Sequence, residues 1–157
     1  MREALKEARK AREKDEVPVG AVIVANNRVI ARAHNLTETL NDVTAHAEMQ
    51  AITAAAAYLG GKYLKDCTLY VTLEPCLMCA GALYWAQITR IVYGATDSKR
   101  DFSLNPASPL HPATTVTSGI LETECAALLT DFFEKKRRST ERISASAQSQ
   151  RQATEVS

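Results

Sequence analysis

Long apolar runs are absent from this sequence. No stretch approaches the roughly 20 apolar residues that a membrane-spanning helix needs, and residues 1–7 mix charges without the apolar core of a signal peptide. We therefore expect a protein that is neither membrane-bound nor secreted. The hydrophobic fraction of 46% and the charged fraction of 24% are typical of a soluble globular protein. A chain of 157 residues is long enough for one domain with a sizeable core.

The chain also lacks a strong net charge of either sign. Its formal charge is +1, so the molecule as a whole gives no electrostatic reason to bind nucleic acid, and any affinity for RNA has to come from a local patch. One basic cluster stands out, formed by Lys135, Lys136, Arg137, Arg138 and Arg142. It is either a solvated helix face or a surface that follows a phosphate backbone.

Histidine and cysteine are scarce, with three and four copies, yet three of these residues form a meaningful pattern. Cys76 and Cys79 are spaced i, i+3 at the start of an expected helix, and His46 directly precedes another. One imidazole and two thiolates suit zinc, and three protein ligands leave the fourth tetrahedral position open for water, as in catalytic sites. Cys67 and Cys125 we expect to be free, buried thiols of a cytoplasmic protein.

Glu48 lies two residues after His46, close to the expected metal yet free to carry protons instead of binding it. Since residues at i and i+2 diverge within a regular helix, both reach one ion only at the start of a helix. A lone Cys-x-x-Cys is also found in redox pairs and structural zinc sites, and a glutamate in a first turn can simply favour the helix dipole. The two motifs together favour a catalytic site with one zinc ion per chain.

The expected elements alternate between helix and strand, which predicts a three-layer α/β/α domain over residues 1–138. Asn26-Asn27 suits a tight hairpin, and Thr44 is expected to cap the helix that follows His46. Residues 139–157 are rich in Ser, Gln and Ala, and we expect a frayed or disordered tail there. Helices are predicted over 2–15, 47–58, 76–86 and 120–136, and strands over 19–25, 28–33, 68–73, 88–94 and 114–118.

At the metal-binding motifs the chain resembles a known family. His46-Ala47-Glu48, together with Thr-Leu-Tyr-Val-Thr-Leu-Glu-Pro-Cys-Leu-Met-Cys-Ala-Gly-Ala over residues 68–82, is similar to the zinc-dependent deaminases, most closely the bacterial tRNA adenosine deaminase family. The likeness extends to residues 16–22 and 119–133 and fades after about Arg138. It implies the cytidine deaminase-like fold, with a five-stranded mixed sheet and both zinc helices on one face.

The resemblance also implies a function. Glu48 would shuttle protons while adenosine at the wobble position of a tRNA anticodon is hydrolysed to inosine. The anticodon stem-loop is then the partner and a homodimer the expected assembly, with Leu83, Tyr84 and Trp85 as candidates for its interface.

Three further residues match family positions that contact the substrate. Asn35 corresponds to the asparagine that contacts the target nucleoside, and Asp97 to an aspartate that contacts nucleotide sugars. Phe133, in the family's Phe-Phe pair, is expected to stack on flipped-out nucleotides. The ordinary alternatives are a loop asparagine, a solvated turn aspartate and a core phenylalanine.

Two departures keep a second function open. After Asp97 the family usually continues rich in glycine, whereas residues 100–102 here are Arg-Asp-Phe, inside a proline-containing loop over 95–113. Residues 83–86 resemble guanine deaminases. The alternative is therefore a deaminase of a free base or nucleoside, such as guanine or cytosine. A zinc-stabilised binding module without catalysis would have no need of Glu48.

Overall fold

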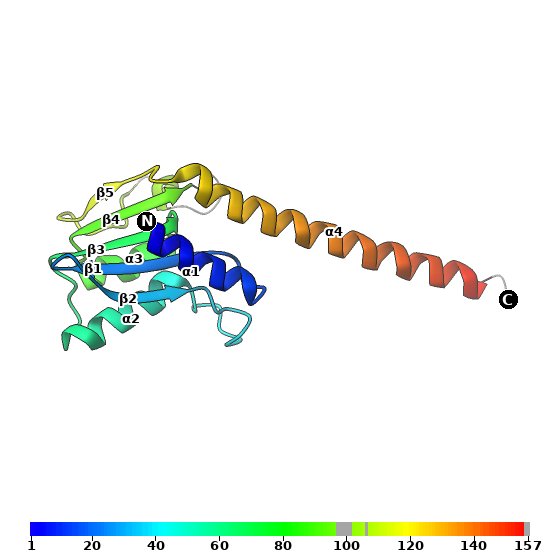
Figure 1. The fold of residues 1–157 in the computed structure, drawn as a ribbon, viewed down its shortest axis with the longest axis horizontal. Helices are drawn as coiled ribbons and strands as arrows, with labels where there is room; N and C mark the ends of the chain where they lie inside the picture. Colours follow the sequence, from blue (N-terminus) through cyan, green and yellow to red (C-terminus); the bar gives the residue numbers. More distant parts are fainter. Residues whose placement is uncertain (97–101, 106, 156–157) are drawn as a thin grey trace.

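A five-stranded sheet lies between two layers of helices (Figure 1). The computed structural model describes residues 1–96, 102–105 and 107–155, with side chains as far as Ser144. Asp97 lies outside the described residues. The strands are β1 (Gly20–Ala25), β2 (Arg28–His34), β3 (Cys67–Leu73), β4 (Arg90–Ala95) and β5 (Thr115–Thr117), arranged in the order β2-β1-β3-β4-β5.

The sheet is mixed, as expected. β1 runs antiparallel to both β2 and β3, whereas β3, β4 and β5 are parallel to one another. The turn between β1 and β2 is the predicted tight hairpin, in which Asn26 and Asn27 both adopt positive φ. β3 lies at the centre of the sheet, which explains its continuous run of apolar and β-branched residues.

The helices divide between the two faces of the sheet. α2 (Ala47–Leu59) and α3 (Leu77–Ala86) contribute to one core cluster with the strands, through Ala51, Ala55, Ala80 and Leu83. α1 (Arg2–Glu13) and α4 (Glu122–Glu155) cover the other face, where Leu5 and Cys125 meet in a smaller cluster. The three-layer α/β/α prediction is therefore confirmed. A short 3₁₀ helix, η1 (Phe102–Leu104), was not predicted.

Small residues let the helices approach the sheet closely. A Cβ atom added to Gly20 would lie 2.1 Å from the carbonyl oxygen of Ala4 in α1, so α1 packs directly on the backbone of β1. Gly94 is similar, since its added Cβ would lie 2.4 Å from Sγ of Cys125 in α4. The alanine residues of α2 favour helix formation, and their small side chains allow α2 to pack close to the sheet.

α4 is longer than the sequence indicated. Cys125 is buried as predicted, and Phe132 on the same helix is buried as well. The expectation that the helix ends near residue 136 is wrong, because it continues to Glu155. Alanine, glutamine, arginine and glutamate in the tail are good helix formers. Every side chain from Phe133 to Ser144 is exposed, and this part of α4 projects away from the sheet (Figure 1).

None of the helices in the described ranges combines the length and the apolar character that crossing a bilayer requires.

Glu16 holds the loop that leads from β2 to α2. Its side chain is fully buried and accepts hydrogen bonds from Oγ1 of Thr37 at 3.2 Å and from the backbone N–H groups of Glu38 at 3.1 Å and Thr39 at 2.7 Å. Burial alone would raise the pKa of this carboxyl, but these hydrogen bonds outweigh it and the pKa is lowered. The ionised form of Glu16 is therefore stabilised by folding.

We predict that Glu16→Gln lowers the free energy of unfolding at pH 7 by about 1–3 kcal/mol, because three donors lose a charged acceptor. The contribution of a group whose folded pKa is lowered is present above its unfolded pKa, near 4.5, and is lost as the pH falls through the folded value. The difference between wild type and variant should therefore shrink below pH 4.5. Urea unfolding followed by circular dichroism at pH 7 and pH 4 measures it. An equal difference at both pH values would show that ionisation of Glu16 is not involved.

Candidate metal centre and active site

Three potential metal ligands meet where two helices begin. His46 is the N-cap residue of α2, Cys76 is the N-cap residue of α3, and Cys79 lies in the first turn of α3. Nδ1 of His46 lies 3.7 Å from Sγ of Cys76 and 3.6 Å from Sγ of Cys79. A tetrahedral zinc ion with Zn–S near 2.3 Å and Zn–N near 2.0 Å separates its sulfur and nitrogen ligands by roughly 3.5 Å. The three side chains therefore fit one zinc ion as they stand.

The local backbone explains why these ligands can converge. Both N-cap residues are extended, with φ and ψ of −70° and 154° at His46 and −71° and 170° at Cys76. Neither side chain is therefore confined to the regular spacing of its helix. This confirms the prediction that His46 and Glu48 lie at the very start of a helix. The free N–H groups and the positive dipole end of each helix also favour thiolate at this point.

The electrostatics of the cluster favour a bound cation. A hydrogen bond from Cys79, together with one from His46, lowers the pKa of Cys76 to about 4 against the opposing effect of burial. The contact with Cys76 raises the pKa of His46. Cys79 is shifted the other way, because the hydrogen bond to Cys76 and burial both raise its pKa. At neutral pH the cluster thus holds a thiolate, which is the form that binds metal.

Glu48 lies next to the cluster but does not belong to it. It is in the first turn of α2, and its side chain is buried. Among the described residues, the group whose donor atoms could share one ion consists of His46, Cys76 and Cys79 only. Burial, the largest effect, raises the pKa of Glu48 to about 7. A carboxyl with a pKa near neutrality can both take up and release a proton.

Asn35 fixes the start of α2. Its Oδ1 accepts a hydrogen bond of 2.8 Å from the backbone N–H of Ala47, the first residue of the helix. This corrects the expectation that Thr44 is the cap, since Thr44 instead donates through its N–H and Oγ1 to Asp42. Because the oxygen of the Asn35 amide faces Ala47, the Nδ2 group must point the other way.

The structure separates Phe133 from this group. Phe133 lies on α4, on the opposite face of the sheet from α2 and α3. Its ring is 45% exposed and makes an edge-to-face contact with the buried ring of Phe132, with centroids 5.4 Å apart. His46, Cys76, Cys79, Glu48 and Asn35 are brought together at the starts of α2 and α3.

Sequence reasoning missed one buried acid beside the site. Glu74 follows β3 directly and precedes Pro75 and Cys76. Its Oε1 accepts a hydrogen bond of 3.1 Å from the N–H of Ser103, and the N–H of Phe102 donates to the carbonyl of Pro75 at 3.2 Å. Oε2 of Glu74 is buried without a partner among the described residues. η1 is therefore attached to the segment that carries Cys76. The signal in the sequence was an acid directly after a strand of apolar and β-branched residues.

Comparison with known proteins supports the chemistry of this site. Residues 1–95 match the family described as the cytidine and deoxycytidylate deaminase zinc-binding region. The tRNA-specific adenosine deaminase of Bacillus subtilis is 48% identical over 143 residues, which cover 88% of this chain and 89% of that protein.

Two solved structures are also similar. One comes from a study of A-to-I editing by tRNA:A34 deaminases at the wobble position of transfer RNA. It has a TM-score of 0.76 and 50% identity and covers 82% of this chain and 97% of its own. The guanine deaminase of Bacillus subtilis has a TM-score of 0.59 and 39% identity, covering 65% of this chain and 69% of its own. The chain therefore belongs to the zinc-dependent cytidine and deoxycytidylate deaminase family and, within this family, to the group of the tRNA-specific adenosine deaminases.

Proposed function

We propose that this protein hydrolyses adenosine to inosine at the wobble position of a tRNA anticodon, releasing ammonia. The observation that carries this proposal is the convergence of His46, Cys76 and Cys79 at zinc-binding distances beside the buried carboxyl of Glu48. The relatives named as tRNA-specific adenosine deaminases support the choice of substrate.

We propose one zinc ion per chain, held by His46, Cys76 and Cys79. When bound, zinc supplies a water molecule that loses a proton near pH 7 instead of near 15.7. Glu48 would take one proton from the attacking water and pass it to a ring nitrogen of the base. It would then take the second proton from the hydroxyl group now on the base and deliver it to the departing amine, which leaves as ammonia. Its burial keeps other proton donors away, and its first-turn position places it beside the ligands without coordinating the ion.

Glu48→Gln should keep zinc and the fold but lower turnover by a factor of about 10²–10⁴, because only proton transfer is removed. Metal content by mass spectrometry, thermal unfolding and inosine formation measure the three properties. Glu13→Gln, an exposed position at the end of α1, is the matched control and should behave as wild type. A Glu48→Gln protein that retains more than about a tenth of the activity would exclude this role.

Asn35 we propose as a substrate ligand, acting through Nδ2 because Oδ1 is engaged with Ala47. Two substitutions separate this role from helix capping. Asn35→Asp keeps an acceptor for the N–H of Ala47 but loses the donor, whereas Asn35→Ala loses both.

We expect Asn35→Ala to lower the free energy of unfolding by about 1 kcal/mol and Asn35→Asp to stay near wild type. Both should lose activity to a similar extent. Chemical denaturation and steady-state kinetics on the same preparations make the comparison. An Asn35→Asp enzyme as active as wild type would show that the donor is not used.

Asp97 and Phe133 we propose as contacts to the RNA around the target base. A carboxylate that binds a 2′-hydroxyl distinguishes RNA from DNA, and an exposed aromatic ring stacks on an unpaired base. Phe133 is suitably exposed on α4.

The substrate is tested by inosine formation on an anticodon stem-loop, its deoxy counterpart and free adenosine, with free guanine and cytosine assayed in parallel. Wild type should act on the RNA stem-loop most efficiently. Asp97→Ala should weaken turnover of this RNA by about 1–3 kcal/mol, expressed as kcat/KM, and reduce the preference for RNA over DNA. Efficient turnover of guanine with an inert stem-loop would instead favour the function of the similar guanine deaminase.

We also propose a homodimer in the cytoplasm. α3 carries exposed apolar side chains: Trp85 is 77% exposed, and Leu77, Met78 and Tyr84 are also exposed. Such a group is more typical of an interface than of a solvated helix. Leu83, which was also expected at the interface, is instead fully buried in the core. All four cysteines are unpaired, which suits a reducing compartment.

A further inference from the structure

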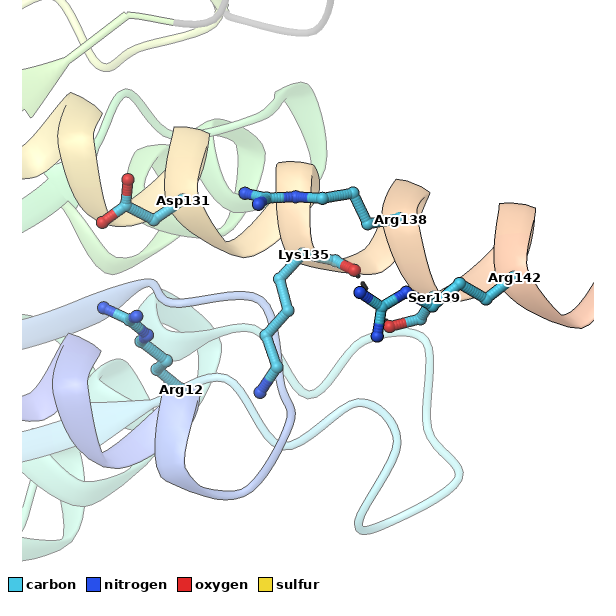
Figure 2. Close-up of a pocket in the computed structure, with 6 residues that line it drawn as sticks. All are labelled: Arg12, Asp131, Lys135, Arg138, Ser139 and Arg142. Carbon is cyan, nitrogen blue, oxygen red and sulfur yellow. Dashed lines mark hydrogen bonds between the residues drawn. The ribbon is translucent and has the colours of Figure 1, made fainter.

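An open groove of about 450 Å³ lies between the end of α1 and the exposed part of α4 (Figure 2). Four of its six lining residues are cations and one is an acid, although the whole chain carries a charge of only +1. Its lining consists of Arg12, Asp131, Lys135, Arg138, Ser139 and Arg142. Positive charge is therefore concentrated here far above its average over the chain.

The α4 side of the groove follows the helical repeat. Lys135, Arg138 and Arg142 are spaced i, i+3 and i+7 and so share one face of the helix. This face lies beyond Phe132, the last buried residue of the described helix, so it contributes nothing to the core. Figure 2 shows Lys135 reaching from α4 toward the end of α1, where Arg12 forms the facing wall.

Most of these cations are not neutralised by the protein. Arg138 lies 3.5 Å from Glu134, but both side chains are largely exposed and the pair is weak. Within the described ranges, no carboxylate lies within ion-pair distance of Arg12, Lys135 or Arg142. Like charges that face one another across a groove repel, and this repulsion is relieved when an anion binds between them.

The groove is next to the segment that leads into the active site. Lys136, on the neighbouring face of α4, pairs with Asp15 at the end of α1. The adjacent residue, Glu16, holds the backbone of Glu38 and Thr39 in the loop between β2 and α2. His46 follows at the end of this loop. The groove and the segment that leads to His46 are therefore connected through Asp15 and Glu16.

We propose that this groove binds the sugar–phosphate backbone of the anticodon stem, outside the loop that carries the target base; the proposal rests on the proposed function. The distance along α4 from Lys135 to Arg142 is about 10 Å. A row of cations of this length can contact a few successive phosphates of one strand. Arg and Lys contacts to phosphate position a nucleic acid without reading its sequence. The groove thus orients the stem, and the site at His46 selects the base.

The test compares two triple variants with the same change of charge. Arg12→Gln/Lys135→Gln/Arg142→Gln removes three groove cations. Arg28→Gln/Lys62→Gln/Lys65→Gln is the control. It removes three cations that do not line the groove, one at the start of β2 and two in the segment between α2 and β3. Each protein is assayed on an anticodon stem-loop and on the single-stranded loop oligonucleotide without its stem, over a range of salt concentrations.

We expect the groove variant to lose at least tenfold in kcat/KM on the stem-loop, mainly through KM, with kcat/KM on the loop oligonucleotide within twofold of wild type. Its salt dependence should weaken by about 0.7–0.9 in log–log slope for each phosphate that the variant no longer neutralises. The control variant should match wild type on both substrates. Equal behaviour of the two triple variants on the stem-loop would overturn the proposal, and so would equal losses by the groove variant on both RNAs.

The experiment distinguishes failure of the proposed function from failure of the groove proposal. If wild type deaminates neither RNA, that function is wrong, and the groove is then judged by binding alone. Fluorescence anisotropy of a labelled stem-loop should still show at least tenfold weaker binding to the groove variant than to the control variant. Equal binding of the stem-loop by the two variants would also overturn the proposal that the groove binds RNA.

Discussion

The closeness of two helix starts is the constraint on which the rest of this structure depends. A zinc ion with one nitrogen and two sulfur ligands requires its donor atoms to lie within about 4 Å of one another, and His46, Cys76 and Cys79 come from the first turns of two separate helices. α2 and α3 must therefore lie side by side on one face of the sheet. Small residues make this possible, since Ala51, Ala55 and Ala80 are fully buried where the helices meet the strands.

Buried carboxylates hold the segments that lie next to the starts of α2 and α3. Glu16 accepts hydrogen bonds from the loop that precedes α2, and Glu74 accepts one from η1 beside the start of α3. Asn35 adds a third contact, to the first N–H of α2. These interactions satisfy backbone groups that neither a helix nor a strand could satisfy. They also explain how an active site built on loop ends and helix starts keeps a defined geometry.

The layers, the hairpin between β1 and β2 and the candidate metal ligands follow from local signals that the sequence displays. Cys76 and Cys79 after Pro75, and Asn26-Asn27 between two strands, each have a short-range physical meaning. Thr44 and Asn35 show the limit of such signals, because the true cap comes from a strand end 12 residues before Ala47. η1 and the partner of Glu74 likewise depend on contacts between segments far apart in the chain. The length of α4 was missed for another reason, since its polar composition is equally compatible with an exposed helix and with a disordered tail.

Zinc coordination tests the central claim most directly. X-ray absorption at the zinc edge should show two sulfur ligands near 2.3 Å and two nitrogen or oxygen ligands near 2.0–2.1 Å, one from His46 and one from water. Cys79→Ser should reduce the sulfur count to one, whereas Cys67→Ser should leave the spectrum unchanged. A spectrum with three or four sulfur ligands, or one that Cys79→Ser does not alter, would contradict an open site formed by His46, Cys76 and Cys79.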